Sequence, residues 1–136
     1  MYVRRTLEMK VRKFLKRPEI LAIIGPRQAG KTTLMKMIHE KLPQSTFISF
    51  EDARILGLFE HEIDQFAETY VRGRNYLFID EFQYAAHGGK RLKYLFDHFT
   101  TKIVISGSSV ADLTIQAIKY LVGRIIVIEL FPFDFF

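Results

Sequence analysis

Residues 25–32 read GPRQAGKT and match the pattern GxxxxGK[ST] at Gly25, Gly30, Lys31 and Thr32. In this pattern the backbone N–H groups of a glycine-rich loop surround a β-phosphate, and the N-terminus of the following helix adds partial positive charge. Lys31 is a compact cation that can reach the β- and γ-phosphates, and the Thr32 hydroxyl is a suitable ligand for Mg²⁺. The stretch therefore predicts binding of a nucleoside triphosphate.

Five short apolar runs alternate with segments of helical periodicity. The runs are nearly continuous and rich in β-branched and aromatic residues, which is typical of strands buried on both faces of a parallel sheet. They cover residues 20–24, 47–50, 76–79, 103–105 and 125–128. Apolar residues at helical spacing occupy residues 34–42, 59–70, 92–99 and 110–121. We predict an α/β fold with roughly five mainly parallel strands between helices, preceded by one additional helix.

The flanks of the quoted stretch fit a phosphate-binding loop. An apolar run ends directly before Gly25, and a segment with helical spacing begins near Lys31. Such a loop requires this strand–loop–helix context. It would lie at the carboxyl end of a strand, where open α/β sheets bind their ligands.

A second motif places two carboxylates at the end of a buried strand, because residues 76–81 read YLFIDE. We expect Asp80 to hold Mg²⁺ through water, since this ion keeps much of its hydration shell. Glu81 is the expected catalytic base that orients and deprotonates the attacking water. An acidic pair is common at strand ends, and the phosphate-loop pattern upstream favours the functional interpretation here.

Two further segments are candidates for contact with the γ-phosphate. Residues 106–109 read SGSS at the end of the predicted fourth strand, so Ser106 or Ser108 is a candidate for sensing the γ-phosphate, while Ser108 or Ser109 also fits a helix N-cap. Arg124 stands directly before the last strand. Its guanidinium fits an arginine finger, acting in trans if subunits assemble, or a strand-edge arginine that pairs with a carboxylate such as Glu129.

The net charge of +5 is concentrated at the N-terminus. Residues 1–17 contain seven basic residues and one acidic residue, a net charge of +6. Their apolar residues repeat at helical spacing at Leu7, Val11, Phe14 and Leu15. The segment predicts a basic amphipathic helix. It is either a solvated helix docked on the rest of the protein or a surface for nucleic acid or an acidic partner.

Composition excludes several classes of protein. The chain has no cysteine, which excludes disulfides, thiolate metal sites and cysteine nucleophiles. The basic N-terminus is not followed by the apolar segment of a signal peptide, and no run is long enough to span a membrane, so we expect a cytoplasmic protein. The four histidines form no recognisable ligand set, so we predict no metal site made by protein side chains alone.

Other phosphate-loop proteins fit the sequence less well. A GTPase would carry an NKxD motif, whereas the only asparagine, Asn75, is followed by Tyr76. A small-molecule kinase needs an acceptor pocket and rarely uses an adjacent pair of carboxylates such as Asp80 and Glu81.

Four motifs in order resemble those of prokaryotic ATPases of the AAA+ type, the archaeal-type ATP-binding proteins with a GPRQ loop and a DEFQ or DEIQ box. They are GPRQAGKTT, YLFIDEFQ, KIVISGSS and VGRIIVIELFPFDFF. The resemblance covers nearly the whole chain and includes Gln83 after the carboxylates. It implies ATP as ligand and Mg²⁺ as cofactor, with Asp80 and Glu81 as metal and catalytic carboxylates. The cradle that it implies consists of Gly25, Pro26, Arg27, Gln28, Ala29, Gly30, Lys31, Thr32 and Thr33.

The resemblance also implies residues 106–108 as the γ-phosphate-sensing segment and Arg124 as a finger or sensor. We therefore expect residues 1–136 to form an ATPase domain that couples ATP hydrolysis to a partner-binding surface, with assembly into a homo-oligomer as a further expectation. The alternative is a nucleotide-binding interaction module, associated with nucleic acid through residues 1–17, that has little or no turnover. Members of this family continue beyond the segment that ends here in four phenylalanines among six residues, so we expect the chain to be either one part of a longer protein or a shortened gene product.

Overall fold

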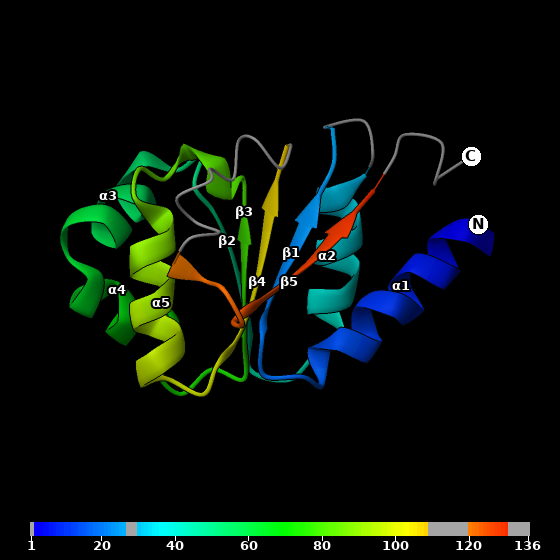
Figure 1. Cartoon of the computed structure of the whole chain (residues 1–136), viewed down its shortest axis with the longest axis horizontal. Coiled ribbons are helices and arrows are strands. Elements are labelled where there is room, and N and C mark those ends of the chain that lie inside the picture. The colour runs from blue at the N-terminus through cyan, green and yellow to red at the C-terminus, as the bar shows by residue number, and fades with distance from the viewer. Residues whose placement is uncertain (1, 27–29, 109–119, 131–136) are drawn as a thin grey trace.

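A sheet between two layers of helices forms the body of the protein (Figure 1). The computed structural model describes residues 2–26, 30–108 and 120–130. Its helices are α1 (Tyr2–Leu15), α2 (Lys31–Glu40), α3 (Ala53–His61), α4 (Ile63–Tyr70) and α5 (Gly88–His98), with a short 3-10 turn, η2, at Phe82–Tyr84. Its strands are β1 (Ile20–Ile24), β2 (Ser45–Ser49), β3 (Tyr76–Asp80), β4 (Lys102–Gly107) and β5 (Ile125–Glu129).

The five strands lie in the order β2-β3-β4-β1-β5, and all four pairings are parallel. The chain leaves β1 toward the β2 edge of the sheet, whereas it leaves β4 toward the β5 edge. The neighbouring strands β1 and β4 therefore flank the point where the direction of winding reverses. Ligands of open α/β sheets bind outside the carboxyl ends of strands at such a point.

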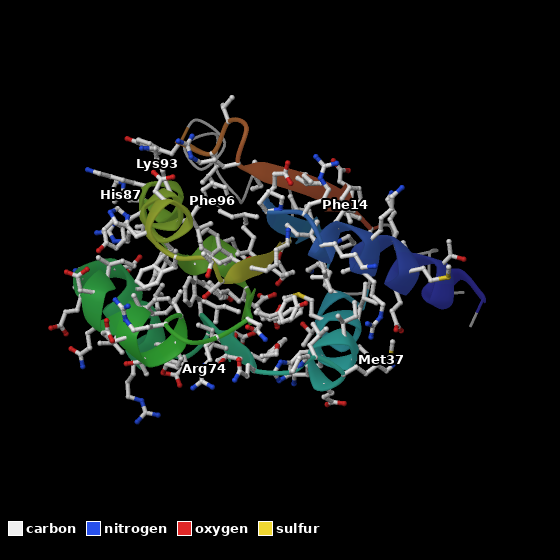
Figure 2. All side chains as sticks on the ribbon, turned by 90° about the horizontal axis from the view of Figure 1, so that it is seen from below. Phe14, Met37, Arg74, His87, Lys93 and Phe96 are labelled. Atoms are coloured by element: carbon white, nitrogen blue, oxygen red, sulfur yellow. The ribbon has the colours of Figure 1, made fainter. Side chains whose placement is uncertain are left out.

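Both faces of the sheet are buried, and alternate residues of β1 belong to opposite layers. Ile20, Ala22 and Ile24 lie in a core cluster with residues of α3, α4 and α5. Leu21 and Ile23 lie in a second cluster with residues of α1 and α2. Figure 2 shows the side chains that fill the two layers. This two-sided burial explains why the strands read as continuous apolar runs.

A cluster of phenylalanines lies in the first layer, near the carboxyl ends of β2 and β3. The ring of Phe50 lies 4.9 Å from that of Phe59 and 5.6 Å from that of Phe82, measured between centroids. The ring of Phe66 contacts Phe59 at 5.2 Å. Phe82 is only 2% exposed, so the turn that follows β3 is anchored in the core.

The predicted fold class is confirmed, with differences in the helices. Helical structure begins at Ala53, before the periodic segment 59–70. That segment is divided between α3 and α4, because Glu62 adopts a non-helical conformation with φ −140° and ψ 65°. The break allows Phe59 and Phe66 to meet on the same side of the sheet. The helix expected at residues 110–121 and the phenylalanine-rich end lie largely or wholly outside the described residues, as does Ser109.

The N-terminal segment forms α1, which packs on the α2 face of the sheet through Val11 and Leu15. Glu8 pairs with Arg12 at 3.0 Å and with Lys41, just after α2, at 3.3 Å. Exposed cations in and directly after the helix are Lys10, Lys13, Lys16 and Arg17. None of the described helices is long and apolar enough to cross a membrane.

Candidate functional site

The phosphate-loop motif joins the carboxyl end of β1 to the N-terminus of α2. Gly25 is buried, and its N–H donates to the carbonyl of Gly107 at the end of β4, at 3.1 Å. Gly30 precedes α2 with φ 78° and ψ 24°, a left-handed conformation that favours glycine. The predicted residues Arg27, Gln28 and Ala29 lie outside the described part of the chain.

Lys31 begins α2 and turns back over the loop. Its side chain is 2% exposed, and Nζ donates to the carbonyl oxygens of Gly25 at 2.6 Å and of Pro26 at 3.3 Å. These carbonyl dipoles stabilise the buried ammonium group. Lys31 therefore lies at the loop, where the sequence predicts it, whereas Thr33 lies exposed on the first turn of the helix.

Thr32 connects the loop with the carboxylate strand. Its hydroxyl donates to Oδ2 of Asp80 at 2.8 Å. Ser106 of β4 donates to the other oxygen, Oδ1, at 2.5 Å. Asp80 thus accepts hydrogen bonds from both sides, although it is only 5% exposed.

The environment of Ser106 differs from the one expected for a side chain that contacts the γ-phosphate. It is fully buried, and besides its bond to Asp80 its Oγ accepts the backbone N–H of Glu81 at 3.0 Å. It holds the end of β3 against β4. Ser108, two residues further on, is only partly buried and lies at the mouth of this region.

Glu81 and Gln83 occupy the turn after β3. Glu81 has φ 56° and ψ 48°, a conformation that is uncommon for residues other than glycine and that is concentrated at functional sites. Nε2 of Gln83 donates to Oε2 of Glu81 at 3.0 Å and to Oγ of Ser108 at 3.2 Å.

A cavity of about 160 Å³ lies between Lys31, Thr32, Glu51 and Glu81. Glu51 is a residue that the motifs did not indicate. Its position shortly after β2 is the signal that was available, because carboxyl ends of parallel strands meet at one edge of the sheet. Within the described ranges, no group of three or more His, Asp and Glu side chains is placed to hold a metal ion.

Arg124 is the predicted site residue that the structure does not bring to this cluster. Its carbonyl accepts the N–H of Ile20, so it lies beside the beginning of β1, about 16 Å from the end of that strand. Its guanidinium pairs with Asp97 of α5 at 3.3 Å. A contact with the loop of its own chain does not fit this position.

A family model described as AAA domain matches residues 17–136, a range that contains the loop, both carboxylates and all five strands. The chain belongs to this AAA domain family. The match begins at Arg17, after the end of α1.

Two curated proteins are similar to this chain over most of its length. The uncharacterized proteins Mb2031c of Mycobacterium bovis and Rv2008c of Mycobacterium tuberculosis are each 30% identical over 129 residues. The alignment covers 93% of this chain and 28% of each relative. The chain therefore spans less than a third of the length of these relatives.

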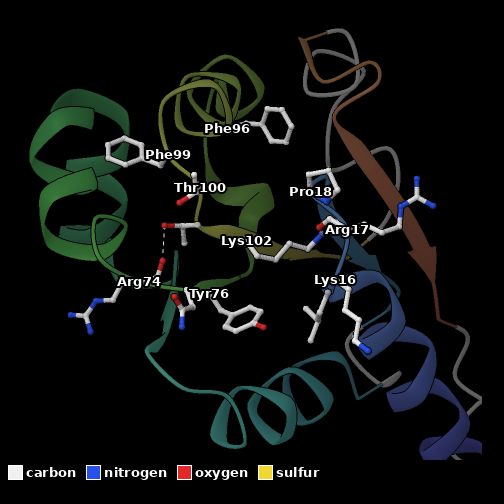
Figure 3. A pocket seen from close by; sticks show the side chains of 12 residues that line it. Lys16, Arg17, Pro18, Arg74, Tyr76, Phe96, Phe99, Thr100 and Lys102 are labelled. Atoms are coloured by element: carbon white, nitrogen blue, oxygen red, sulfur yellow. Dashed lines mark hydrogen bonds between the residues drawn. The ribbon is translucent and has the colours of Figure 1, made fainter.

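A groove of about 530 Å³ lies at the opposite edge of the AAA domain, below the amino ends of the strands (Figure 3). Lys102 crosses it and donates from Nζ to the carbonyl oxygens of Arg17 and Glu19. Burial lowers the pKa of Lys102 to about 8, and the nearby Arg17 charge adds to this effect while Glu19 opposes it.

The depressed pKa of Lys102 predicts a stability that depends on pH. Between pH 8 and 10.5 the unfolded chain binds a proton at this lysine more strongly than the folded chain does, so the free energy of unfolding rises with pH in that window. The gain is at most about 3 kcal/mol. Urea unfolding at pH 8 and pH 10 should show it in the wild type and not in Lys102→Met.

Lys90→Met removes an exposed lysine of α5 and serves as the matched control. Its unfolding free energy should follow the wild-type pH dependence. Parallel curves for the wild type and Lys102→Met would contradict the assignment.

Proposed function

We propose that this chain is the ATPase domain of an archaeal-type AAA+ protein, which binds ATP with Mg²⁺, hydrolyses it and couples the nucleotide state to a partner-binding surface. The observation that carries the proposal is the bond between Thr32 and Asp80, which joins the phosphate-loop motif to the carboxylate strand. Lys31 and Glu81 line the same cavity.

The donor set fits Mg²⁺. A hydroxyl group has one proton and two lone pairs, so Thr32 can donate to Asp80 and still offer a lone pair to a cation. Carboxylate and hydroxyl oxygens are the ligands that Mg²⁺ prefers, usually together with water and phosphate. When bound, the ion would neutralise phosphate charge.

The charges around the cavity favour the nucleotide together with its metal ion. Glu51 and Glu81 line the cavity, and Asp80 is bonded to Thr32 at its wall, whereas Lys31 supplies the cationic side chain. Three carboxylates would repel a triphosphate that arrives alone. We therefore expect ATP to bind only weakly without divalent cation.

Each residue has a defined task in this proposal. Lys31 exchanges the carbonyls of Gly25 and Pro26 for phosphate oxygens, and the N-terminus of α2 adds its partial positive charge. Glu81 orients the attacking water and takes up its proton. Asp80 and Thr32 hold the metal ion.

Two substitutions separate binding from turnover. Lys31→Ala removes a charged donor and should weaken the binding of ATP with Mg²⁺ about 100-fold or more, since two charged hydrogen bonds account for about 3 kcal/mol. Glu81→Gln should bind ATP within twofold of the wild type, with phosphate release slower by a factor of about 10² to 10⁴. Calorimetry and a phosphate-release assay measure the two effects.

The control is Lys36→Ala, which removes the same charge from the exposed face of α2. It should leave both measurements close to wild type. An unchanged ATP titration for Lys31→Ala would remove the loop assignment, and unchanged turnover for Glu81→Gln would remove the catalytic assignment.

The alternative is a nucleotide-binding module with little turnover that associates with nucleic acid. Its support is the exposed basic side of the N-terminal segment, at Lys10, Lys13, Lys16 and Arg17. Binding of a mixed-sequence oligonucleotide should then weaken steeply with salt and fall more than about tenfold in Lys13→Glu/Arg17→Glu.

Charge reversal at Lys90 and Lys93 of α5 is the control for net charge. If the oligonucleotide binds equally to both variants, the N-terminal segment is not the contact surface. Absence of binding at low salt would leave two interpretations of that segment, a solvated helix docked on the protein and a surface for an acidic partner.

A role for Arg124 requires a second copy of the chain, because its position lies at the edge remote from its own loop. We expect a homo-oligomer in which this guanidinium reaches the γ-phosphate of a neighbour. Mixing inactive Lys31→Ala with inactive Arg124→Ala should then restore part of the hydrolysis. Lack of restoration would leave Arg124 as the structural partner of Asp97.

A further inference from the structure

Gln83 contacts the predicted catalytic base directly. Its two amide hydrogens are directed to Oε2 of Glu81, at 3.0 Å, and to Oγ of Ser108, at 3.2 Å. It thereby links the turn after β3 to the segment after β4. The roles proposed above for the other residues of the site do not account for these two contacts of Gln83.

The chemistry decides which end of the amide faces Glu81. An ionised carboxylate only accepts hydrogen bonds, so the NH₂ group has to face it, and the opposite orientation would place two oxygens against each other. In this orientation Oε1 of Gln83 is buried without a hydrogen-bond partner among the residues that the structure describes. Such an atom is unfavourable for stability. The position of the amide group thus satisfies its two N–H donors at the expense of its oxygen.

The backbone around Gln83 is held on both sides. Phe82 is anchored among the phenylalanine rings of the first core layer. The N–H of Glu81 is bound to the buried hydroxyl of Ser106. The 3-10 turn at Phe82–Tyr84 then directs Gln83 back toward Glu81.

We propose that Gln83 is a positioning residue that fixes the orientation of the Glu81 carboxylate, with Ser108 as its second anchor. The inference rests on the proposed function, since it assigns a role in the same hydrolysis. A donor on one oxygen narrows the set of rotamers that a glutamate carboxylate samples. The orientation of the base affects the rate of hydrolysis, because the base can take up a proton only within hydrogen-bond reach.

The first test does not require turnover. The side-chain ¹H–¹⁵N signals of Gln83, identified by their loss in Gln83→Met, should move in Glu81→Gln, because the charged acceptor of one amide hydrogen is replaced by a neutral group. The same signals should stay in place in Glu51→Gln, which changes a carboxylate of the same cavity. Gln83 signals that are unchanged in Glu81→Gln would overturn the proposal.

The second test uses steady-state ATP hydrolysis. Gln83→Met has a similar length but no donor, and it should lower kcat about tenfold while KM for ATP stays within about twofold. Gln83→Glu has the shape of glutamine but lacks the donor and sets a second carboxylate against Glu81, so it should not restore the kcat that Gln83→Met loses. A side chain that served only for packing would be restored by this substitution of the same shape.

Two matched variants complete the design. Gln65→Met changes an exposed glutamine of α4 and should behave like the wild type. Ser108→Ala removes the second anchor, and its effect on kcat should be non-additive with that of Gln83→Met, because both belong to one hydrogen-bonded group. Additive effects, or an unchanged kcat in Gln83→Met, would overturn the proposal.

The two proposals fail in different ways. If the wild type hydrolyses ATP and Gln83→Met equals it, the role of Gln83 is wrong and the proposed function stands. If the wild type releases no phosphate but the Gln83 signals move in Glu81→Gln, the proposed hydrolysis fails and the positioning contact stands.

Discussion

The hydroxyl group of Ser106 is the contact on which this end of the sheet depends. It is fully buried, donates to Asp80 at 2.5 Å and accepts the N–H of Glu81 at 3.0 Å. One hydroxyl group therefore sets the direction of the first carboxylate and the unusual backbone of the second. Without it, a buried carboxylate oxygen and a buried N–H group would both lose a partner, which is costly in a protein interior.

The polar cluster is confined to the carboxyl end of an otherwise apolar sheet. Three adjacent strands, β1, β4 and β3, each end in one part of it, and their bodies are held by core layers on both faces. Because the core is close-packed, these strand ends have little freedom to shift relative to one another. The Thr32–Asp80 bond then spans the width of β4 and joins the loop helix to β3.

Much of the fold could be predicted because both faces of the strands are buried, which leaves a clear apolar signal at residues 20–24 and 76–80. The helix break at Glu62 could not be predicted, since a break at one residue leaves the sequence spacing of Phe59 and Phe66 unchanged. Gln83 belongs to a motif of the sequence and Glu51 follows a predicted strand, but the contacts of both depend on turn geometry, which no local pattern reports. Arg124 is different, because the residue before a parallel strand must lie at the edge away from the loop, and the predicted sheet already required this.

The insertion of β4 between β1 and β3 also acts as a spacer. Neighbouring strands lie about 4.8 Å apart, so the backbone ends of β1 and β3 are separated by about 9.6 Å. Adjacent strands would bring the backbone of the loop against the backbone of the carboxylate strand. Two strand spacings instead leave the contact to side chains, as in the bond between Thr32 and Asp80. In the proposed function, the same separation gives room for a terminal phosphate and its nucleophile.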